Sequence, residues 1–148
     1  MPRTSSSNAP TTENIGFLLA KASQRFNERL TERFTARGFG DVRASYGSVL
    51  VPLFERDGLR LGELAGAARL SKQAMTGLVK RCEAVGLVQR ETDPEDGRAF
   101  NVRLTARGRA LRAVAQEVLS ELDDELVRGL GARNRDALIR ALKGVIDL

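Results

Sequence analysis

Apolar residues recur at helical spacing over most of the chain, and glycines separate the periodic segments. In the first segment they lie three or four positions apart from Glu13 onward, which predicts a helix of about six turns. The sequence Gly38-Phe39-Gly40 is expected to end this helix, because glycine disfavours helical backbone. The stripe consists of Ile15, Leu18, Leu19, Ala22, Phe26, Leu30 and Phe34.

Three shorter helices are predicted next. Ser45 has the side chain of an N-cap, and the helix that it begins is expected to end near Gly58. Pro52 lies inside this helix and must either kink or split it, because proline lacks an amide hydrogen; the pattern leaves both possibilities open. Residues 61–68 then predict a short helix, and residues 71–85 predict a longer one.

The spacing then changes to the period of two that is typical of strands. Residues 88–92 and 99–104 flank a turn-rich loop with the sequence DPEDGR, which predicts a β-hairpin. Phe100, Val102 and Leu104 alternate with polar residues, so one face of the hairpin is expected to be buried.

Two amphipathic helices are predicted after the hairpin. Thr105 can cap a long helix, and Gly129 and Gly131 are expected to interrupt it before a last helix. The predicted fold is therefore mainly α with a small β-hairpin. The stripes of the terminal helices exceed the need of one small domain, which favours pairing with a second copy; alternatively, the termini pack on each other within one chain. The C-terminal stripes consist of Leu111, Val114, Val118, Leu122 and Leu126, and then Leu138, Leu142, Val145 and Ile146.

The positive charge is concentrated in the middle of the chain. The formal net charge of the 148 residues is +5. Residues 69–109 hold nine Lys or Arg and five Asp or Glu, a net charge of +4, whereas residues 1–68 carry +2 and residues 110–148 carry −1. Contacts with DNA phosphates would use this excess, although a solvated basic surface explains the charge equally well.

Several classes of protein are excluded by residues that the chain lacks. A single cysteine cannot form a disulfide within the chain, and without histidine neither a histidine-based triad nor a histidine-ligated metal site can form. No paired nucleophile and base, and no glycine-rich phosphate loop, is found. We therefore expect no enzyme, no cofactor and no metal.

The ends and the hydropathy of the chain predict where it resides. No apolar run approaches the roughly 20 residues of a membrane span. Residues 1–12 are rich in Ser, Thr, Pro and Asn, which predicts a disordered tail, and they lack the apolar core of a signal peptide. These features predict a soluble, cytoplasmic protein that does not associate with a membrane.

The predicted helix over residues 71–85 has one face suited to DNA. Its buried stripe is expected to hold Met75, Leu78, Val79 and Cys82, which makes the cysteine a core residue rather than a redox sensor. On the opposite face, Gln and Lys can bind base edges, Thr can contact a thymine methyl group, and Gly77 removes bulk. An ordinary solvated face is the alternative. The DNA-binding candidates are Ser71, Lys72, Gln73, Thr76, Lys80 and Arg81, with Ser45 from the start of the helix that ends near Gly58.

The tip of the hairpin combines three carboxylates with Arg98. Since carboxylates repel phosphate, we expect Asp96 to hold Arg98, or another arginine of the hairpin, by a short ion pair. Arg98 is then the cation that reaches DNA. Arg90 and Arg103 on the strands are candidates for phosphate contacts, and a solvated sheet face accounts for them equally well.

With these motifs, the chain resembles the MarR family of bacterial transcription regulators. The resemblance extends from about residue 13 to the end and rests on the helix pair LGELAGAARLSKQAMTGLVKRCEAVGLVQR and the wing DPEDGRAFNVRLTARG. It implies a winged helix-turn-helix core, residues 41–104, flanked by dimerisation helices, residues 13–40 and 105–148. It also implies a homodimer in which each module reads half of a palindromic operator in double-stranded DNA.

The resemblance further implies a small-molecule pocket where the dimerisation helices meet the DNA-binding lobe. Phe26, Arg43 and Tyr46 are candidates to line it, although a core or surface role suits each of them individually. The chain lacks the first-helix cysteine of the peroxide-sensing branch and the histidines of the zinc-sensing branch. This leaves a phenolic or other organic effector, or none.

The expected function is a dimeric, sequence-specific repressor that such a ligand releases from DNA, and an activator also remains open. The alternative is an architectural DNA-binding protein with little sequence preference, whose affinity would depend on salt but hardly on the DNA sequence.

Overall fold

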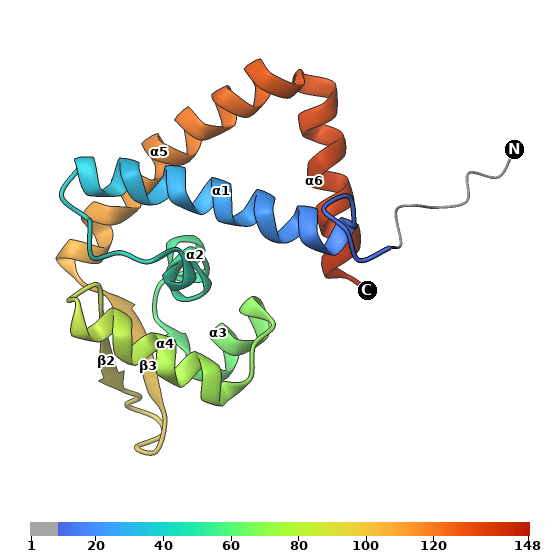
Figure 1. Ribbon diagram of the computed structural model, residues 1–148. Helices are drawn as coiled ribbons and strands as arrows, with labels where there is room; N and C mark the ends of the chain where they lie inside the picture. The colour runs from blue at the N-terminus through green and yellow to red at the C-terminus, as the bar shows by residue number, and fades with distance from the viewer. Residues whose placement is uncertain (1–8) are drawn as a thin grey trace, which may run out of the picture.

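The computed structural model describes residues 9–148, which fold into six α-helices and three short strands (Figure 1). Most of the predicted N-terminal tail, residues 1–8, lies outside the described residues; residues 9–12 form bends and a turn. The helices are α1 (Ile15–Ala36), α2 (Gly47–Glu55), α3 (Leu61–Ala68), α4 (Lys72–Ala84), α5 (Ala106–Leu130) and α6 (Ala132–Ile146). The strands are β1 (Leu59–Arg60), β2 (Val88–Thr92) and β3 (Phe100–Leu104), and a 3₁₀ turn (Ala44–Tyr46) precedes α2.

Side-chain caps fix the starts of three helices. The Asn14 side chain accepts a hydrogen bond from the Gly16 amide at 2.9 Å, and Ser71 accepts one from the Ala74 amide at 3.1 Å. Thr105 caps α5 in the same way, as its position in the sequence predicted. Each cap satisfies an amide that has no partner inside the helix.

The prediction that Ser45 caps the second helix is wrong. Ser45 lies inside the 3₁₀ turn, and α2 begins two residues later without a side-chain cap. The Gly47 amide instead bonds to the carbonyls of Ala44 and Ser45, so backbone groups satisfy the start of this helix. α2 then runs through Pro52 to Glu55, which settles that the proline does not split it.

The wing belongs to a three-stranded antiparallel sheet with the order β1-β3-β2, rather than to a hairpin alone. β2 and β3 pair along their full length, from Val88 opposite Leu104 to Thr92 opposite Phe100. β1 pairs with the other edge of β3, with Leu59 opposite Val102. The sequence did not indicate β1, because two residues are too short to show a period and only the pairing defines the strand.

The long helix α5 connects the sheet to the terminal helices. In Figure 1 it rises away from β3, and α6 then turns back toward the rest of the molecule. Gly129 lies inside α5, contrary to expectation, and Gly131 alone ends the helix with a φ of 84°. The C-terminal end of α6 approaches the turn between α3 and α4, where Arg69 bonds to Ile146 O at 3.0 Å and to Asp147 at 2.6 Å.

The stripes of α1 and α5 pack on each other within the chain. Leu111, Val118 and Leu122 of α5 are buried, as is Phe34 of α1, so these residues belong to the core of a single chain. Two arginines of α1 and the residue that caps its C-terminus also form ion pairs with two glutamates of α5 along this contact: Arg29, Arg33 and Arg37 with Glu121 and Glu125. The sequence pattern favoured pairing of this stripe with a second copy, but Leu122 is buried within its own chain.

A different apolar surface remains exposed. α6 has no buried residue, and the first turns of α1 contribute Ile15, Phe17 and Leu18 to the exposed surface. We call the exposed apolar residues of α6 the α6 stripe: Leu138, Ile139, Leu142, Val145 and Ile146. An amphipathic helix whose apolar residues stay exposed in its own chain favours burial against another molecule.

Candidate DNA-binding site

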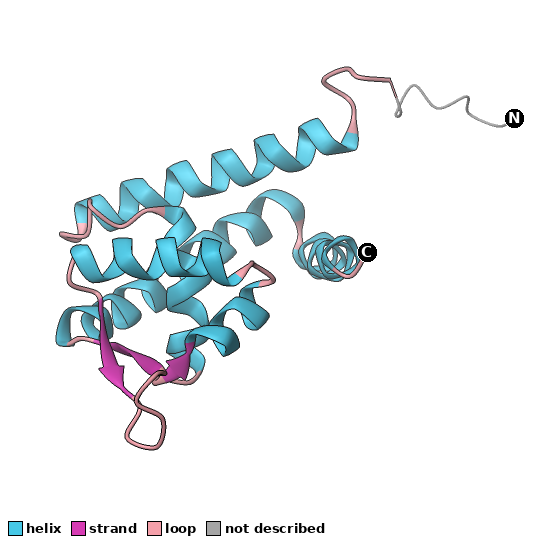
Figure 2. Cartoon of the chain, turned by 90° about the horizontal axis from the view of Figure 1, so that it is seen from below, coloured by secondary structure: helices cyan, strands magenta, loops and turns pink. Residues whose placement is uncertain are grey.

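α4 and the sheet lie together at one end of the molecule, opposite the junction of α5 and α6 (Figures 1 and 2). α3 and α4 form a helix-turn-helix, in which Arg69 adopts a left-handed conformation with φ 55° and the Leu70 amide bonds to Ala65 O at 2.9 Å. This bond closes the turn and sets α4 across α3. The loop between β2 and β3 projects beyond α4 in both views, so helix and wing can approach one surface.

The inner face of α4 is the one that the sequence predicted. Met75, Leu78, Val79 and Cys82 are all buried, the cysteine completely. Burial raises the pKa of the Cys82 thiol to about 12, because the thiolate would lose its hydration. Cys82 is therefore a core residue that stays a thiol at neutral pH, which confirms its predicted packing role.

The outer face of α4 carries the predicted polar candidates. Lys72, Gln73, Lys80 and Arg81 are exposed, and Ser71 caps the helix with its hydroxyl. Thr76 is half-buried, and its hydroxyl donates to Lys72 O at 2.8 Å. Since the backbone carbonyl takes the hydroxyl hydrogen, Thr76 can offer a partner outside the chain its methyl group and the hydroxyl oxygen as an acceptor.

Gly77 lies in the interior of α4, and a Cβ built there would meet no atom of the chain within 4 Å. Its backbone is ordinary helix; among residues 9–148, the residues with positive φ are Arg69 and four other glycines. Glycine in a helix interior costs about 0.5–1 kcal/mol relative to alanine. Nothing within the described chain compensates for this cost, so the fold itself does not require glycine at this position.

The base of the wing is held by an ion pair that the sequence did not indicate. Asp93 is buried, with 5% of its surface exposed, and accepts hydrogen bonds from the Glu95 amide at 2.9 Å and from Arg60 of β1 at 2.5 Å. The amide and the Arg60 guanidinium hold the pKa of Asp93 below its ordinary value. Of the tip's three carboxylates, this one is therefore turned inward and neutralised. Nothing in the sequence distinguishes Arg60 from the other arginines as the partner of Asp93.

The expected ion pair between Asp96 and Arg98 is replaced by a backbone contact. The Asp96 carboxylate accepts a hydrogen bond from the Arg98 amide at 3.0 Å, and the Ala99 amide bonds to Asp96 O at 3.0 Å. A short acidic side chain commonly bonds the amide two residues on, which closes a tight turn. Asp96 thus fixes the backbone at the tip, while the Arg98 side chain is exposed.

Two arginines lie on the strands of the wing, and both have acidic partners. Arg90 pairs with Glu83 at the end of α4, at 3.1 Å, and its guanidinium lies 5.4 Å from the centre of the Phe100 ring. Arg103 pairs with Glu91 on the neighbouring strand at 2.5 Å. These pairs fasten the wing to α4 and strand to strand, so both arginines have a structural role independent of any phosphate.

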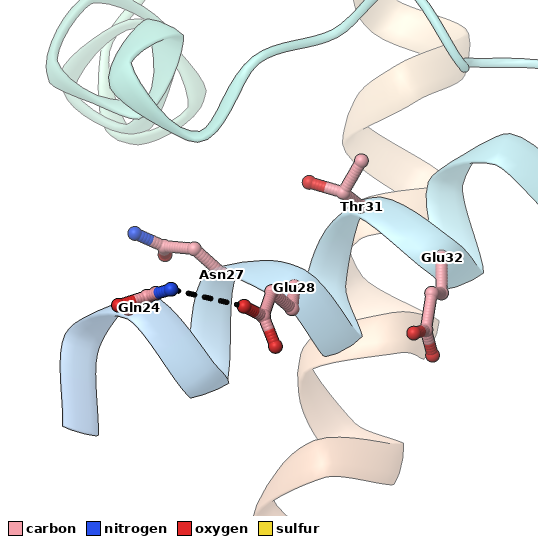
Figure 3. Close-up of a pocket in the computed structure, with 5 residues that line it drawn as sticks. All are labelled: Gln24, Asn27, Glu28, Thr31 and Glu32. Atoms are coloured by element: carbon pink, nitrogen blue, oxygen red, sulfur yellow. Dashed lines mark hydrogen bonds between the residues drawn. The ribbon is translucent and has the colours of Figure 1, made fainter. Parts of the chain in front are cut away.

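The three candidates for a ligand pocket lie in different surroundings. Tyr46 is buried in the core, Phe26 is half-buried and packs against the core, and Arg43 is exposed. An open hollow lies on α1 (Figure 3). The Gln24 amide bonds to Glu28 at 3.3 Å there, and the residues that line the hollow are all of polar or acidic type: Gln24, Asn27, Glu28, Thr31 and Glu32.

This geometry defines a winged helix-turn-helix DNA-binding protein, and sequence comparison agrees. The model of the MarR family matches residues 45–100. The chain is 31% identical over 137 residues to the HTH-type transcriptional repressor NicR of Pseudomonas putida, covering 92% of this chain and 84% of NicR. It is 34% identical over 91 residues to the HTH-type transcriptional repressor Rv2887 of Mycobacterium tuberculosis, covering 62% of this chain and 66% of that protein. The chain belongs to the MarR family of transcriptional regulators.

Solved structures of similar fold include DNA-bound and ligand-regulated proteins. The repressor CouR bound to a 23-mer DNA duplex has a TM-score of 0.77 and 27% identity, covering 91% of this chain and 94% of CouR. BpsR of Bordetella bronchiseptica, whose DNA binding is regulated by 6-hydroxynicotinic acid, has a TM-score of 0.77 and 25% identity, covering 93% of this chain and 96% of BpsR. Rv2887 in complex with salicylic acid has a TM-score of 0.61 and 27% identity, covering 89% of this chain and 96% of that one.

No helix among residues 9–148 combines the length and the apolar character that crossing a membrane requires.

Proposed function

We propose that this protein is a dimeric repressor that binds a palindromic operator in the cytoplasm and leaves it when a small aromatic acid binds. The observation that carries the proposal is the joint exposure of the α4 face and the wing tip at one end of the molecule. A helix in a major groove and an arginine in the adjacent minor groove would read two features of one duplex.

Each element of this end has a separate role in the proposal. Gln73 and Lys80 meet base edges or phosphates from α4, and Gly77 lets the groove approach the helix backbone closely. Ser71 presents the N-terminus of α4 to a phosphate. Arg98 enters the minor groove from the wing, whose tip Asp96 and Asp93 fix through backbone contacts.

Dimerisation is assigned to the α6 stripe and the exposed start of α1. Five large apolar residues of α6 are each at least 36% exposed in the single chain. Two such helices, one from each copy, would bury these residues, as the interfaces of permanent homodimers do. Two reading modules would then face half-sites about one helical turn apart.

The effector is assigned by class from the ligands named for BpsR and Rv2887, both of which are small aromatic acids. The described hollow on α1 is open and lined by polar and acidic residues, which suits an aromatic anion poorly. We therefore assign the effector site to a surface that the second copy completes.

The test is selection of binding sites from a random duplex library by the purified dimer, followed by titration of the selected duplex against random DNA. Specific affinities typically exceed non-specific ones by about 10³-fold or more. The proposal predicts a selected palindrome, and release from it by millimolar salicylate or 6-hydroxynicotinate. Equal affinity for selected and random duplexes would instead establish an architectural binder, and binding unaffected by either acid would refute the effector class.

A further inference from the structure

The reading helix α4 is attached to the dimer helix α5 through three consecutive carbonyl groups. These carbonyls follow the end of α4, at Val85, Gly86 and Leu87, where a helix leaves acceptors without partners. The Arg107 guanidinium donates to Val85 O at 2.6 Å, the Thr105 hydroxyl donates to Gly86 O at 2.5 Å, and the Thr105 amide donates to Leu87 O at 3.0 Å. The first turn of α5 therefore holds the end of α4 directly.

The packing at this junction leaves no spare room. Gly108 is buried beneath the same loop, and a Cβ built on it would lie 2.2 Å from Leu87 O. Such a contact is far inside van der Waals distance, so the backbone of α5 can approach the loop only because residue 108 is glycine. α4 and α5 are consequently related by contacts at fixed distances rather than by a flexible link.

Arg107 adds a third segment to this junction, the loop between α1 and α2. Its guanidinium donates to Asp41 at 2.7 Å and lies 5.1 Å from the centre of the Phe39 ring. The planar guanidinium thus bonds the end of α4 and an acid of the loop at once, while its face covers an aromatic ring. A lysine would reach one of these partners at a time, because its ammonium is compact and has no planar face.

We propose that Arg107 is the residue that sets the angle of each reading module relative to the dimer helices, and thereby the half-site spacing that the dimer accepts. The reading module here means α3, α4 and the three strands; the dimer helices are α1, α5 and α6. This inference rests on the proposed dimeric, palindrome-binding function. Arg107 contacts no DNA in it and acts as a positioning residue.

The physical basis is the geometry of two modules on one duplex. A shift of one base pair between half-sites moves them by about 3.4 Å and rotates them by roughly 35° about the helix axis. Modules held at a fixed angle cannot follow this rotation, so a wrong spacing removes the contacts of one half-site. If the junction is loosened, the modules can follow this rotation and bind both half-sites at a wrong spacing. The affinity for the correct spacing is then lower, because the orientation of the modules is no longer set before they bind.

The experiment measures affinity as a function of spacing. The parent dimer first selects its palindrome from a random duplex library, and duplexes with one base pair added or removed at the centre are then prepared. For the parent, each change of spacing is expected to weaken binding by about ten-fold or more, since contacts of one half-site are lost. For Arg107→Ala, affinity for the selected palindrome should fall several-fold, and the penalty for changed spacing should shrink to less than about three-fold.

Controls separate positioning from stability. Arg112→Ala removes an exposed arginine of the same helix and should keep the parental spacing profile. Arg107→Lys should fall between parent and alanine. A variant that is merely less stable has a smaller active fraction but an unchanged ratio between spacings, so the ratio reports on positioning alone.

Two further variants cover the case in which Arg107→Ala does not fold. Asp41→Ala and Phe39→Leu each remove one contact of the guanidinium and should flatten the spacing profile partly. A parental profile in Arg107→Ala, or in both substitutes if that variant is unfolded, overturns the inference. Failure of the parent to select any palindrome overturns the proposed function first, and the two failures are therefore distinguishable.

Discussion

Replacing Gly77 by alanine should raise the stability of the protein and lower its affinity for DNA. Gly77 lies in the interior of α4, and an added Cβ meets no atom of the described chain within 4 Å. The methyl group therefore costs nothing in the folded chain, and it restricts the unfolded one. Glycine to alanine at such a position stabilises by about 0.5–1 kcal/mol.

The expected changes follow from these magnitudes. For a chain near 150 residues, about 1 kcal/mol corresponds to roughly 2–4 °C in Tm, so Gly77→Ala should melt about 1–4 °C higher. If the DNA groove touches the helix backbone at Gly77, the new methyl group must push the DNA away from α4. Extra methyl groups in well-packed contacts cost about 1–3 kcal/mol, which is about five-fold to 150-fold in affinity per half-site.

The assay pairs thermal unfolding with titration of the selected palindrome. Gly129→Ala is the matched control, because that glycine also has no neighbour within 4 Å but lies in the last turn of α5. It should stabilise slightly and leave affinity unchanged. A Gly77→Ala protein with a higher Tm and parental affinity would falsify the close approach, and a lower Tm would show that the space around Gly77 is not free.

Three further outcomes are expected. Leu142 and Ile146 are 38% and 59% exposed, which together amount to about one whole apolar side chain per copy. If the dimer buries this surface, the double variant Leu142→Gln with Ile146→Gln should lose roughly 3–6 kcal/mol of association free energy per dimer. Its dimer Kd should then rise at least 100-fold in sedimentation measurements. Arg98→Ala should lower operator affinity about ten-fold with folding and dimerisation intact, with Arg98→Lys a partial rescue, and parental affinity at moderate salt would exclude a role for the wing tip. The pKa of Asp41 lies below its ordinary value of 3.8 because the Arg107 guanidinium bonds it, so its carboxylate stabilises the fold above that pH and loses this contribution as the pH falls through the lowered pKa. Urea unfolding should accordingly show a shallower loss of stability in acid for Asp41→Asn than for the parent, and identical acid profiles would contradict the assignment.

The local structure follows closely from the order of residues. Spacing of apolar residues predicted α4 and its buried stripe, and the cap Thr105 was predicted because a hydroxyl at a helix start can accept a hydrogen bond from a free amide. The alternation in β3 gave its buried face in the same way. Such features depend on neighbours within a few positions, which the sequence displays directly.

Contacts between distant segments were decided by the tertiary structure alone. β1 exists only because β3 lies beside it, and Asp93 is turned inward only because Arg60 of that strand meets it. The stripe of α5 was compatible with a partner in the same chain or in a second copy, and the packing of Leu122 beneath α1 decided for the same chain.

The contacts of Arg107 could not be predicted from the sequence. In the sequence this residue is one arginine near a glycine, and none of its partners lies within twenty residues. An arginine can pair with any acceptor that the fold brings within reach, so its chemistry names no partner. The amino-acid sequence determined which segments are helices, which faces are apolar and which residues are candidates for DNA contacts. The tertiary structure decided which charges are already paired and which apolar faces remain open, because both depend on distances that only the folded chain defines.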